Sequence, residues 1–411
     1  MLNALFPRWS TRFLTLPLLG PVADDFDTWA STQGYRRSTR CRWARALHRI
    51  DGDLRRHGMW PGGMWTQADL DACWMRYRQR DPDTAGTIRA LLRFLQARSR
   101  LVITPPTLTR VGTLARSYGI ALEDLRGLAP ATIRQHVFTA AQFLSHLDYE
   151  LGPERLAALT ASDVEVFVHG VGKRLSRASL QHTVAQLRGF LRFLASSGVV
   201  CPGFDRQIDT PRVYRQEQLP RRLPWPTVRR LLHSIDRRTR LGLRDYTMLF
   251  LIANGLRACE IVALTLDAID WRSRRLHVPG RKTGIPLVLP LTDAAGTVLL
   301  RYLRRGRPSS PHRELFLRER APAGILKPTA VSEVFQHAVR RSGLPIAYHG
   351  PHCLRHSYAV SLLRRGVGLK TLGDLLGQRT AESTCAYLRL ATDDLRDVAL
   401  TAPHAVVRGQ R

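Results

Sequence analysis

Paired cysteines and long apolar runs are absent from this 411-residue sequence. Its six cysteines form no Cys-x-x-Cys pair and no Cys/His cluster with zinc spacing, which argues against a disulfide scaffold and against a zinc module. No apolar run approaches the length of a membrane span. We therefore expect a cytoplasmic protein with reduced thiols that uses no metal ion or other cofactor.

Acidic residues and lysines are also scarce. The chain has 33 acidic residues against 63 lysines and arginines, a formal net charge of +30 and a sequence pI of about 11.3. An excess of this size predicts a polyanionic partner, because basic side chains that neutralise phosphates release counterions. Double-stranded DNA is the partner we expect, and we therefore expect the protein to be associated with the nucleoid. Only four of the basic residues are lysines, namely Lys173, Lys282, Lys327 and Lys370.

The length of the chain and its 44% hydrophobic content predict two or three domains with cores of their own. Proline-rich joints separate three blocks. We predict a mainly α (α+β) protein with a helical N-terminal domain over residues 1–115 and a helical DNA-binding domain over residues 125–205. A linker over 206–222 then leads to a mixed helical domain with a small antiparallel β-sheet over 223–411.

The second block ends in an amphipathic helix. Its apolar residues fall at i, i+4, i+7, i+11 and i+14, which places them on one stripe. These residues are Leu180, Val184, Leu187, Leu191 and Leu194. Arg188 and Arg192 lie off the stripe, one turn apart, so we expect them to face a phosphate backbone.

The first block is similar to the second. Residues 89–95 match residues 188–194 at a constant offset, and residues 66–70 parallel residues 160–164. An internal duplication explains these matches and would make Arg89 and Arg93 DNA-binding residues. Two unrelated helices in a chain rich in leucine and arginine explain them equally well. A second DNA-binding module, a reader of a separate DNA site and a protein-interaction domain all remain open for this block.

Prolines recur between the second and third blocks. Dense prolines exclude a long helix and predict an extended connector. Arg221 and Arg222 lie in this connector and are predicted to contact DNA. The alternative is that they are solvated linker charges.

Two arginine motifs stand out in the third block. Arg257 follows an apolar run, and Glu260 comes three residues later, where its carboxylate would orient the guanidinium on a helix. Arg355 and His352 follow Gly350-Pro351, at the predicted start of another helix. A guanidinium donates two parallel hydrogen bonds to one phosphate, and a helix N-terminus favours the same anion.

Two further motifs complete the set. Arg281 and Lys282 lie between the strand-like runs 275–278 and 287–289, which predict a β-hairpin. Tyr387 closes a segment that begins with Leu376-Gly377-Gln378.

In their order and spacing these four motifs resemble the catalytic domain of the tyrosine recombinase (phage integrase) family over roughly the last 190 residues. The second block resembles the helical core-binding domain of the same family. The resemblance implies a DNA strand-exchange enzyme that needs neither metal nor ATP. Tyr387 would attack the scissile phosphate, leaving a 3′-phosphotyrosine and a free 5′-hydroxyl.

The resemblance also implies a role for each matching residue. Arg257 and Arg355 would clamp the phosphate, and His352 would donate to it or take up the tyrosyl proton. Lys282 would protonate the leaving 5′-oxygen, because the pKa of a lysine can fall far enough for proton transfer. Arg281 competes for this role and is otherwise expected to bind DNA.

Two residues of these motifs stand apart. Gln378 departs from the family pattern, which carries His, sometimes Trp, at this place. An amide can hydrogen-bond a phosphate oxygen but does not accept a proton at neutral pH, so we expect slower turnover. His356, next to Arg355, is expected to be structural and to pack within its own helix.

The function we predict is site-specific DNA recombination for a mobile element, carried out by a homotetramer on duplex DNA, alone or with partner recombinases. The main alternative is a recombinase-fold accessory protein that binds DNA and needs an active partner. Gln378 and the extra N-terminal block favour the accessory protein, whereas the complete set of motif residues argues against it. A type IB topoisomerase shares the chemistry, but the second block resembles the recombinase domain more closely. A helix-turn-helix regulator explains only the charge.

Overall fold

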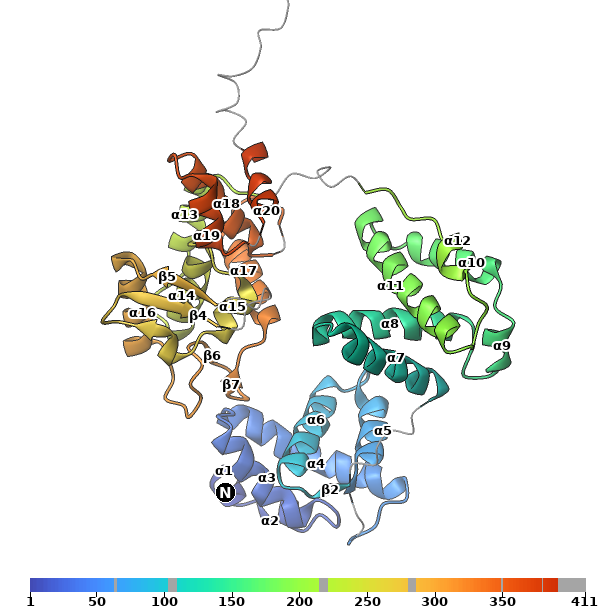
Figure 1. Cartoon of the computed structure of the whole chain (residues 1–411). Coiled ribbons are helices and arrows are strands. Elements are labelled where there is room, and N and C mark those ends of the chain that lie inside the picture. Colours follow the sequence, from blue (N-terminus) through green and yellow to red (C-terminus); the bar gives the residue numbers. More distant parts are fainter. Residues whose placement is uncertain are drawn as a thin grey trace, which may run out of the picture. The chain divides into compact units, whose positions relative to one another are not determined.

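The computed structural model describes residues 1–62, 65–102, 109–213, 221–279, 286–348, 350–378 and 380–390. These residues are mainly helical and contain small β-sheets, so the predicted fold class is confirmed (Figure 1). None of their helices is long and apolar enough to cross a membrane. All six cysteines are free.

The N-terminal block is helical apart from one two-stranded sheet. Its elements are α1 (Leu2–Leu5), α2 (Thr11–Leu14), α3 (Gly20–Thr32), α4 (Arg37–Arg56), β1 (Trp65–Thr66), α5 (Gln67–Tyr77), α6 (Pro82–Ala97) and β2 (Leu101–Val102). Aromatic rings join three of the helices. The ring centroid of Phe26 on α3 lies 5.6 Å from that of Trp43 on α4 and 5.5 Å from that of Phe94 on α6.

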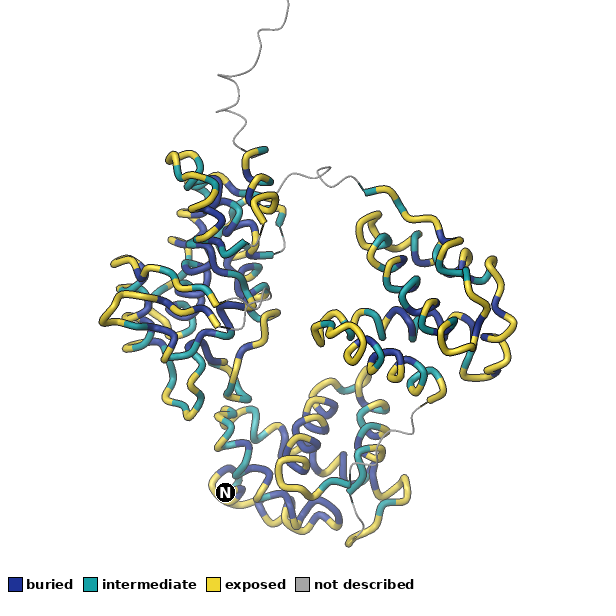
Figure 2. Tube along the Cα trace, in the orientation of Figure 1, coloured by how far each residue is buried: buried dark blue, intermediate teal, exposed yellow. Residues whose placement is uncertain are grey.

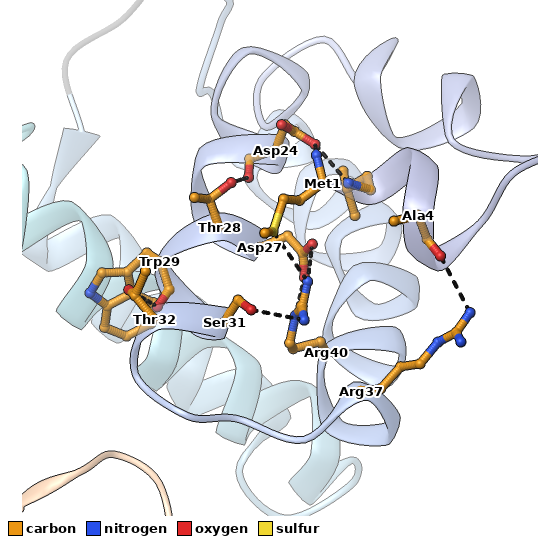
Figure 3. A network of polar contacts seen from close by, with 11 residues as sticks. Met1, Ala4, Asp24, Asp27, Thr28, Trp29, Ser31, Thr32, Arg37 and Arg40 are labelled. Atoms are coloured by element: carbon orange, nitrogen blue, oxygen red, sulfur yellow. Dashed lines mark hydrogen bonds and ion pairs between the residues drawn. The ribbon is translucent and has the colours of Figure 1, made fainter. Parts of the chain in front are cut away.

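A polar network holds α3 against α4 and the chain start (Figure 3). Asp27 is buried on α3 and accepts two hydrogen bonds from the Arg40 guanidinium of α4, at 2.7 and 2.6 Å. The Asp24 carboxylate accepts a hydrogen bond from the amino group of Met1 at 2.5 Å. Because a buried carboxylate is costly unless it is paired, the Asp27–Arg40 pair fixes how α3 and α4 pack.

The middle unit is a second helical bundle. Its helices are α7 (Arg110–Arg126), α8 (Pro130–His146), α9 (Glu154–Ala157), α10 (Ala161–Gly172), α11 (Arg177–Ser196) and α12 (Phe204–Gln207). The predicted stripe lies on α11, where Val184, Leu187, Leu191 and Leu194 are buried and Leu180 is partly buried. Its core is shared with α7, α8 and α10.

The chain that leaves α11 stays attached to the middle unit as far as Pro211. Ile208 is buried in the core of the unit, and its carbonyl accepts a hydrogen bond from Arg188. Gln181 donates to the carbonyl of Pro211 at 3.5 Å. Residues 214–220 of the predicted connector lie outside the described residues.

The C-terminal part combines helices with short strands. Its helices are α13 (Trp225–His233), α14 (Arg240–Ile252), α15 (Ala258–Ala263), η1 (Leu266–Ala268), α16 (Asp293–Arg305), α17 (Pro328–Ser342), α18 (His352–Leu363), α19 (Leu369–Leu376), α20 (Ala381–Cys385) and η2 (Leu388–Leu390). Its strands are β3 (Ile269–Asp270), β4 (Arg275–Val278), β5 (Leu287–Pro290), β6 (Leu317–Arg318) and β7 (Gly324–Ile325).

The antiparallel sheet predicted for this part is present. Strands β3, β4 and β5 form one sheet in that order, and β4 pairs with β5 from Arg275 opposite Pro290 to Val278 opposite Leu287. β4 and β5 therefore form the arms of the predicted hairpin. Arg281 and Lys282 belong to its connecting segment, which lies outside the described residues.

Three separate hydrophobic cores account for most of the buried residues (Figure 2). One lies within residues 2–95, one within 118–208 and one within 223–354. By compactness, residues 102–217 form one unit and the rest of the chain another. A small fourth cluster packs Tyr387 against α18 and α19.

Candidate active site

Arg257 is positioned by a sharp turn between α14 and α15. Gly255 takes the left-handed conformation, with φ of 104°, and the chain then enters α15 directly after Arg257. Glu260 in the first turn of α15 is buried, and its carboxylate accepts both the Arg257 backbone N–H at 2.8 Å and its guanidinium at 2.7 Å. The carboxylate thus fixes the backbone and the side chain of Arg257 together.

Arg355 approaches the same carboxylate from α18. It is 1% exposed, and its guanidinium donates to the carbonyl of Gly255 and, at 2.7 Å, to that of Leu376. Its Nη1 lies 4.0 Å from Glu260 Oε2. Burial, followed by the charge of Arg257, lowers the pKa of Arg355 to about 10, so the guanidinium stays charged at neutral pH.

Tyr387 lies beside this pair of arginines and is 3% exposed. Burial raises the pKa of Tyr387, whereas the charge of Arg355 and hydrogen bonds with Arg355 and Gln378 act in the opposite direction. Arg257 adds a weaker effect of the same sign. The phenol therefore stays protonated at neutral pH, surrounded by groups that would stabilise its anion.

Gln378 follows α19 and is held from two sides. Its backbone N–H donates to the carbonyl of Gly373 at 2.8 Å, and its side-chain oxygen accepts the Thr384 hydroxyl at 2.6 Å. Because the oxygen is occupied by Thr384, the amide NH₂ group is the part of the side chain left to face Tyr387.

Two histidines complete the cluster. His352 and His356 lie one turn apart on α18, with ring centroids 4.4 Å apart, and the His356 ring lies 5.5 Å from that of Tyr387. Desolvation lowers the pKa of His352, and the charges of Arg355 and Arg257 act in the same direction. Burial lowers the pKa of His356 to about 4, and its buried Nδ1 has no hydrogen-bond partner among the described residues.

The structure thus gathers most of the predicted catalytic residues at one place. Six of them are close neighbours, namely Arg257, Glu260, His352, Arg355, Gln378 and Tyr387. The seventh, Lys282, lies outside the described residues. His356 packs within its helix as expected, but its ring also contacts that of Tyr387. The i, i+4 spacing of His356 from His352 is the sequence feature that could have predicted a place in the site, because it puts both side chains on one face of the helix.

The arginines predicted to bind DNA differ in their surroundings. Arg192 is exposed, with a carboxylate oxygen of Asp205 3.9 Å from its guanidinium. Within the part of the chain that the structure describes, the Arg93 guanidinium donates only to the Arg89 carbonyl of its own helix. Arg89 pairs with Asp71 and stacks on Trp74. The Arg188 guanidinium donates a hydrogen bond to the Ile208 carbonyl of its own unit.

Of the connector arginines, Arg221 is exposed and Arg222 is partly buried. No cluster of three or more metal-ligating side chains occurs within the described ranges.

Comparison with known proteins identifies the family. Residues 221–393 match the phage integrase family, and residues 116–198 match the N-terminal SAM-like domain of phage integrases. A putative integrase/recombinase of Sinorhizobium fredii, y4rA, is 32% identical over 77% of this chain and 78% of its own length. The chain belongs to the tyrosine recombinase (phage integrase) family. It is a tyrosine-type site-specific recombinase with a SAM-like DNA-binding domain and a catalytic domain.

Other relatives agree with this assignment. Tyrosine recombinase XerD of Listeria monocytogenes is 32% identical to this chain, over 66% of this chain and 92% of the length of XerD. XerH bound to a palindromic difH substrate shares the fold with a TM-score of 0.55 and 15% identity, over 69% of this chain and 83% of XerH. A lambda integrase dimer bound to a core site shares the fold with a TM-score of 0.52 and 18% identity, over 67% of this chain and 94% of the integrase chain. Structural homologues of the recombinase are therefore bound to DNA.

Proposed function

We propose that the recombinase cuts and rejoins strands of duplex DNA through a 3′-phosphotyrosine on Tyr387. The observation that carries this proposal is the carboxylate of Glu260, which lies 2.7 Å from Arg257 and 4.0 Å from Arg355 beside the buried tyrosine. Guanidiniums that are fixed before the substrate arrives stabilise the charge that develops on the non-bridging phosphate oxygens. Arg257 and Arg355 are therefore the proposed clamp.

In the proposed cleavage step the Tyr387 oxygen bonds to phosphorus while the bond from phosphorus to the 5′-oxygen breaks. The phenolic proton passes to a base, and the leaving 5′-oxygen takes a proton from an acid. In the rejoining step a 5′-hydroxyl from a second strand attacks the phosphotyrosine and releases Tyr387. The phosphotyrosine conserves the energy of the phosphodiester bond, so the exchange needs no ATP.

His352 and Lys282 are the proposed proton carriers. The lowered pKa of His352 leaves its imidazole neutral at pH 7, and a neutral imidazole can accept the tyrosyl proton. Lys282 is proposed as the acid on the strength of its motif. Gln378 is proposed to donate to the tyrosyl or phosphate oxygen and to move no proton.

We infer that the substrate is a pair of duplex sites held by four copies of the chain in the cytoplasm. The net charge of +30 supports a polyanionic substrate. The DNA-bound lambda integrase dimer supports an assembly built from protomer pairs. The accessory-protein alternative keeps one specific support, the amide of Gln378 at a place where the family carries a proton-transferring group.

Covalent trapping tests the proposal. Suicide substrates would be nicked near candidate cleavage sites at the ends of the DNA element that encodes the chain. Wild type would be compared with Tyr387→Phe and with Tyr358→Phe on a denaturing gel, without magnesium or ATP. Tyr358 is a partly buried tyrosine of the same domain and serves as the matched control.

We expect wild type and Tyr358→Phe to give a DNA-shifted band that Tyr387→Phe does not give. A covalent band that survives Tyr387→Phe would mean that the nucleophile is another residue. If wild type binds the substrate but is not trapped, the accessory-protein alternative is favoured.

A further inference from the structure

The N-terminal block repeats the middle unit helix by helix. In the middle unit the four long helices are α7, α8, α10 and α11, and in the N-terminal block they are α3, α4, α5 and α6 (Figure 1). In both blocks the first helix packs on the second, the second on the fourth and the third on the fourth. The two blocks thus share one order of packing.

The buried positions of the paired helices coincide. Every residue that is buried on α7 has a buried counterpart on α3 92 positions earlier, and the same holds for α8 and α4 at 93 positions and for α10 and α5 at 94. For α11 and α6 the offset is 99. Any two amphipathic helices can be slid into phase. Independent helices, however, have no reason to keep an offset that changes by only one position from each pair to the next over three successive pairs.

The ends of the helices repeat as well. The Thr66 hydroxyl caps α5 by accepting the Asp69 N–H at 3.2 Å, and Thr160 caps α10 in the same way from Asp163 at 3.3 Å. After α6 the N–H of Arg100 donates to the Leu95 carbonyl at 2.9 Å, through Ser99 with positive φ. The chain leaves α11 by the same bond at 2.9 Å, 99 positions later, through Gly198 with positive φ.

We propose that α3–α6 form a second SAM-like module, which binds the DNA backbone through arginines on the outward faces of α4 and α6. The middle unit matches the SAM-like domain of phage integrases, so a repeat of its fold predicts a repeat of its use. The proposal rests on DNA as the partner proposed above, but it does not depend on cleavage by Tyr387.

The charges of the block support a polyanion over a protein partner. Residues 1–101 contain 17 arginines, no lysines, nine aspartates and no glutamates. Each of the nine aspartates has a polar or ionic partner within the block. The acidic charge is therefore engaged internally, and a surplus of arginine faces the solvent.

Arg45 and Arg93 are the best-placed contacts. Both are exposed and lie on the outward faces of α4 and α6. Arg93 occupies the position of Arg192 on α11, at the offset of 99. The Arg45 guanidinium lies 5.9 Å from the Phe6 ring centroid, and neither arginine has an acidic partner among the described residues. At the position on α8 that is equivalent to Arg45, 93 residues later, the chain has the exposed Phe138. The two modules would therefore bind DNA with different strength.

The test measures how DNA affinity depends on salt. Full-length chain with Tyr387→Phe would bind a fluorescent duplex of arbitrary sequence, of roughly 40 base pairs or about four helical turns, across a salt series. The pair Arg45→Gln and Arg93→Gln is compared with the pair Arg8→Gln and Arg12→Gln. Arg8 and Arg12 are exposed and lie in the same block but outside the repeated helices. Their substitution removes the same amount of charge. Circular dichroism confirms that all variants are folded.

We expect the Arg45/Arg93 pair to weaken binding several-fold and to reduce the slope of log K against log salt by about 2, close to 0.9 per lost phosphate contact. The Arg8/Arg12 pair should leave the slope unchanged. If the two pairs of substitutions give equal slopes of log K against log salt, the proposal of a second DNA-binding module would be overturned. If the slopes differ as expected while wild type fails to trap DNA covalently, the module stands and the assignment of Tyr387 is at fault.

Discussion

At the scale of single residues, the contact between Thr384 and Gln378 fixes the side chain that is proposed to donate to Tyr387. Thr384 is buried, and its hydroxyl donates to the Gln378 side-chain oxygen at 2.6 Å. Thr384→Val removes this donor with little change in shape and frees the amide to turn away from Tyr387. We expect the rate of covalent trapping to fall about tenfold, which corresponds to ~1.4 kcal/mol and to one ordinary hydrogen bond.

Thr384→Ser is the matched control, because it keeps the hydroxyl and loses a methyl group. Single-turnover trapping of both variants on one suicide substrate makes the comparison. A Thr384→Val variant as fast as Thr384→Ser would show that the orientation of Gln378 does not matter to the chemistry.

The histidines predict how cleavage depends on pH. To act as the proposed proton acceptor, His352 must be neutral, and its pKa lies below the usual 6.5. The rate should therefore be flat at neutral pH and fall about tenfold per unit once the pH drops below that lowered pKa. Two neighbouring groups titrate outside the measured range, because His356 has a pKa of about 4 and Arg355 one of about 10. The charges of Arg257 and Glu260 also act on His352, in opposite directions.

Single-turnover trapping between pH 5 and 8 measures this profile. His352→Gln should react more slowly and without the fall at acid pH, since the group that titrates is gone. An acid fall of the same size in His352→Gln would assign the titration to another group.

At the scale of elements, the turn between α14 and α15 carries the site. Gly255 has a φ of 104°, and its carbonyl accepts the Arg355 guanidinium. A β-carbon at this position would meet Tyr358 at 3.2 Å and Leu376 at 3.3 Å. Gly255→Ala therefore combines backbone strain with crowding, and we expect it to lower the free energy of unfolding by about 2–3 kcal/mol and to slow trapping.

Gly343→Ala provides the control for strain alone. Gly343 also has positive φ, 63°, but a β-carbon there meets nothing within 4 Å. We expect a loss of about 1 kcal/mol without an effect on trapping. Urea unfolding and the trapping rate together make the test, and equal losses for the two variants would mean that the turn tolerates the extra carbon.

Elements were predictable from sequence where a pattern has a single physical meaning. The apolar stripe of α11 and the arms of the hairpin are such cases, because periodicity alone specifies which face is buried. The motif spacing likewise indicated which side chains meet around Tyr387. Spacing does not reveal that Arg355 is almost fully buried or that Thr384 holds Gln378, since both depend on packing between α18, α19 and α20.

At the scale of the whole molecule, separate cores predict separate unfolding. Leu187 and Leu91 are both fully buried, in the cores of the middle unit and of the N-terminal block. Leu187→Ala and Leu91→Ala should each destabilise only its own core, by about 2–5 kcal/mol. Hydrogen exchange of backbone amides, followed peptide by peptide across a urea series, distinguishes the two effects.

Under Leu187→Ala we expect peptides from α8, α10 and α11 to lose protection at lower urea, while those from α4 and α6 keep theirs. Leu91→Ala should give the reverse pattern. A duplicated module that brings its own core to the protein must behave in this way, because its stability arises from contacts that it does not share. If both variants shift all of these peptides together, the two blocks unfold as one cooperative structure. The N-terminal block would then be an extension of the rest of the chain rather than a second domain.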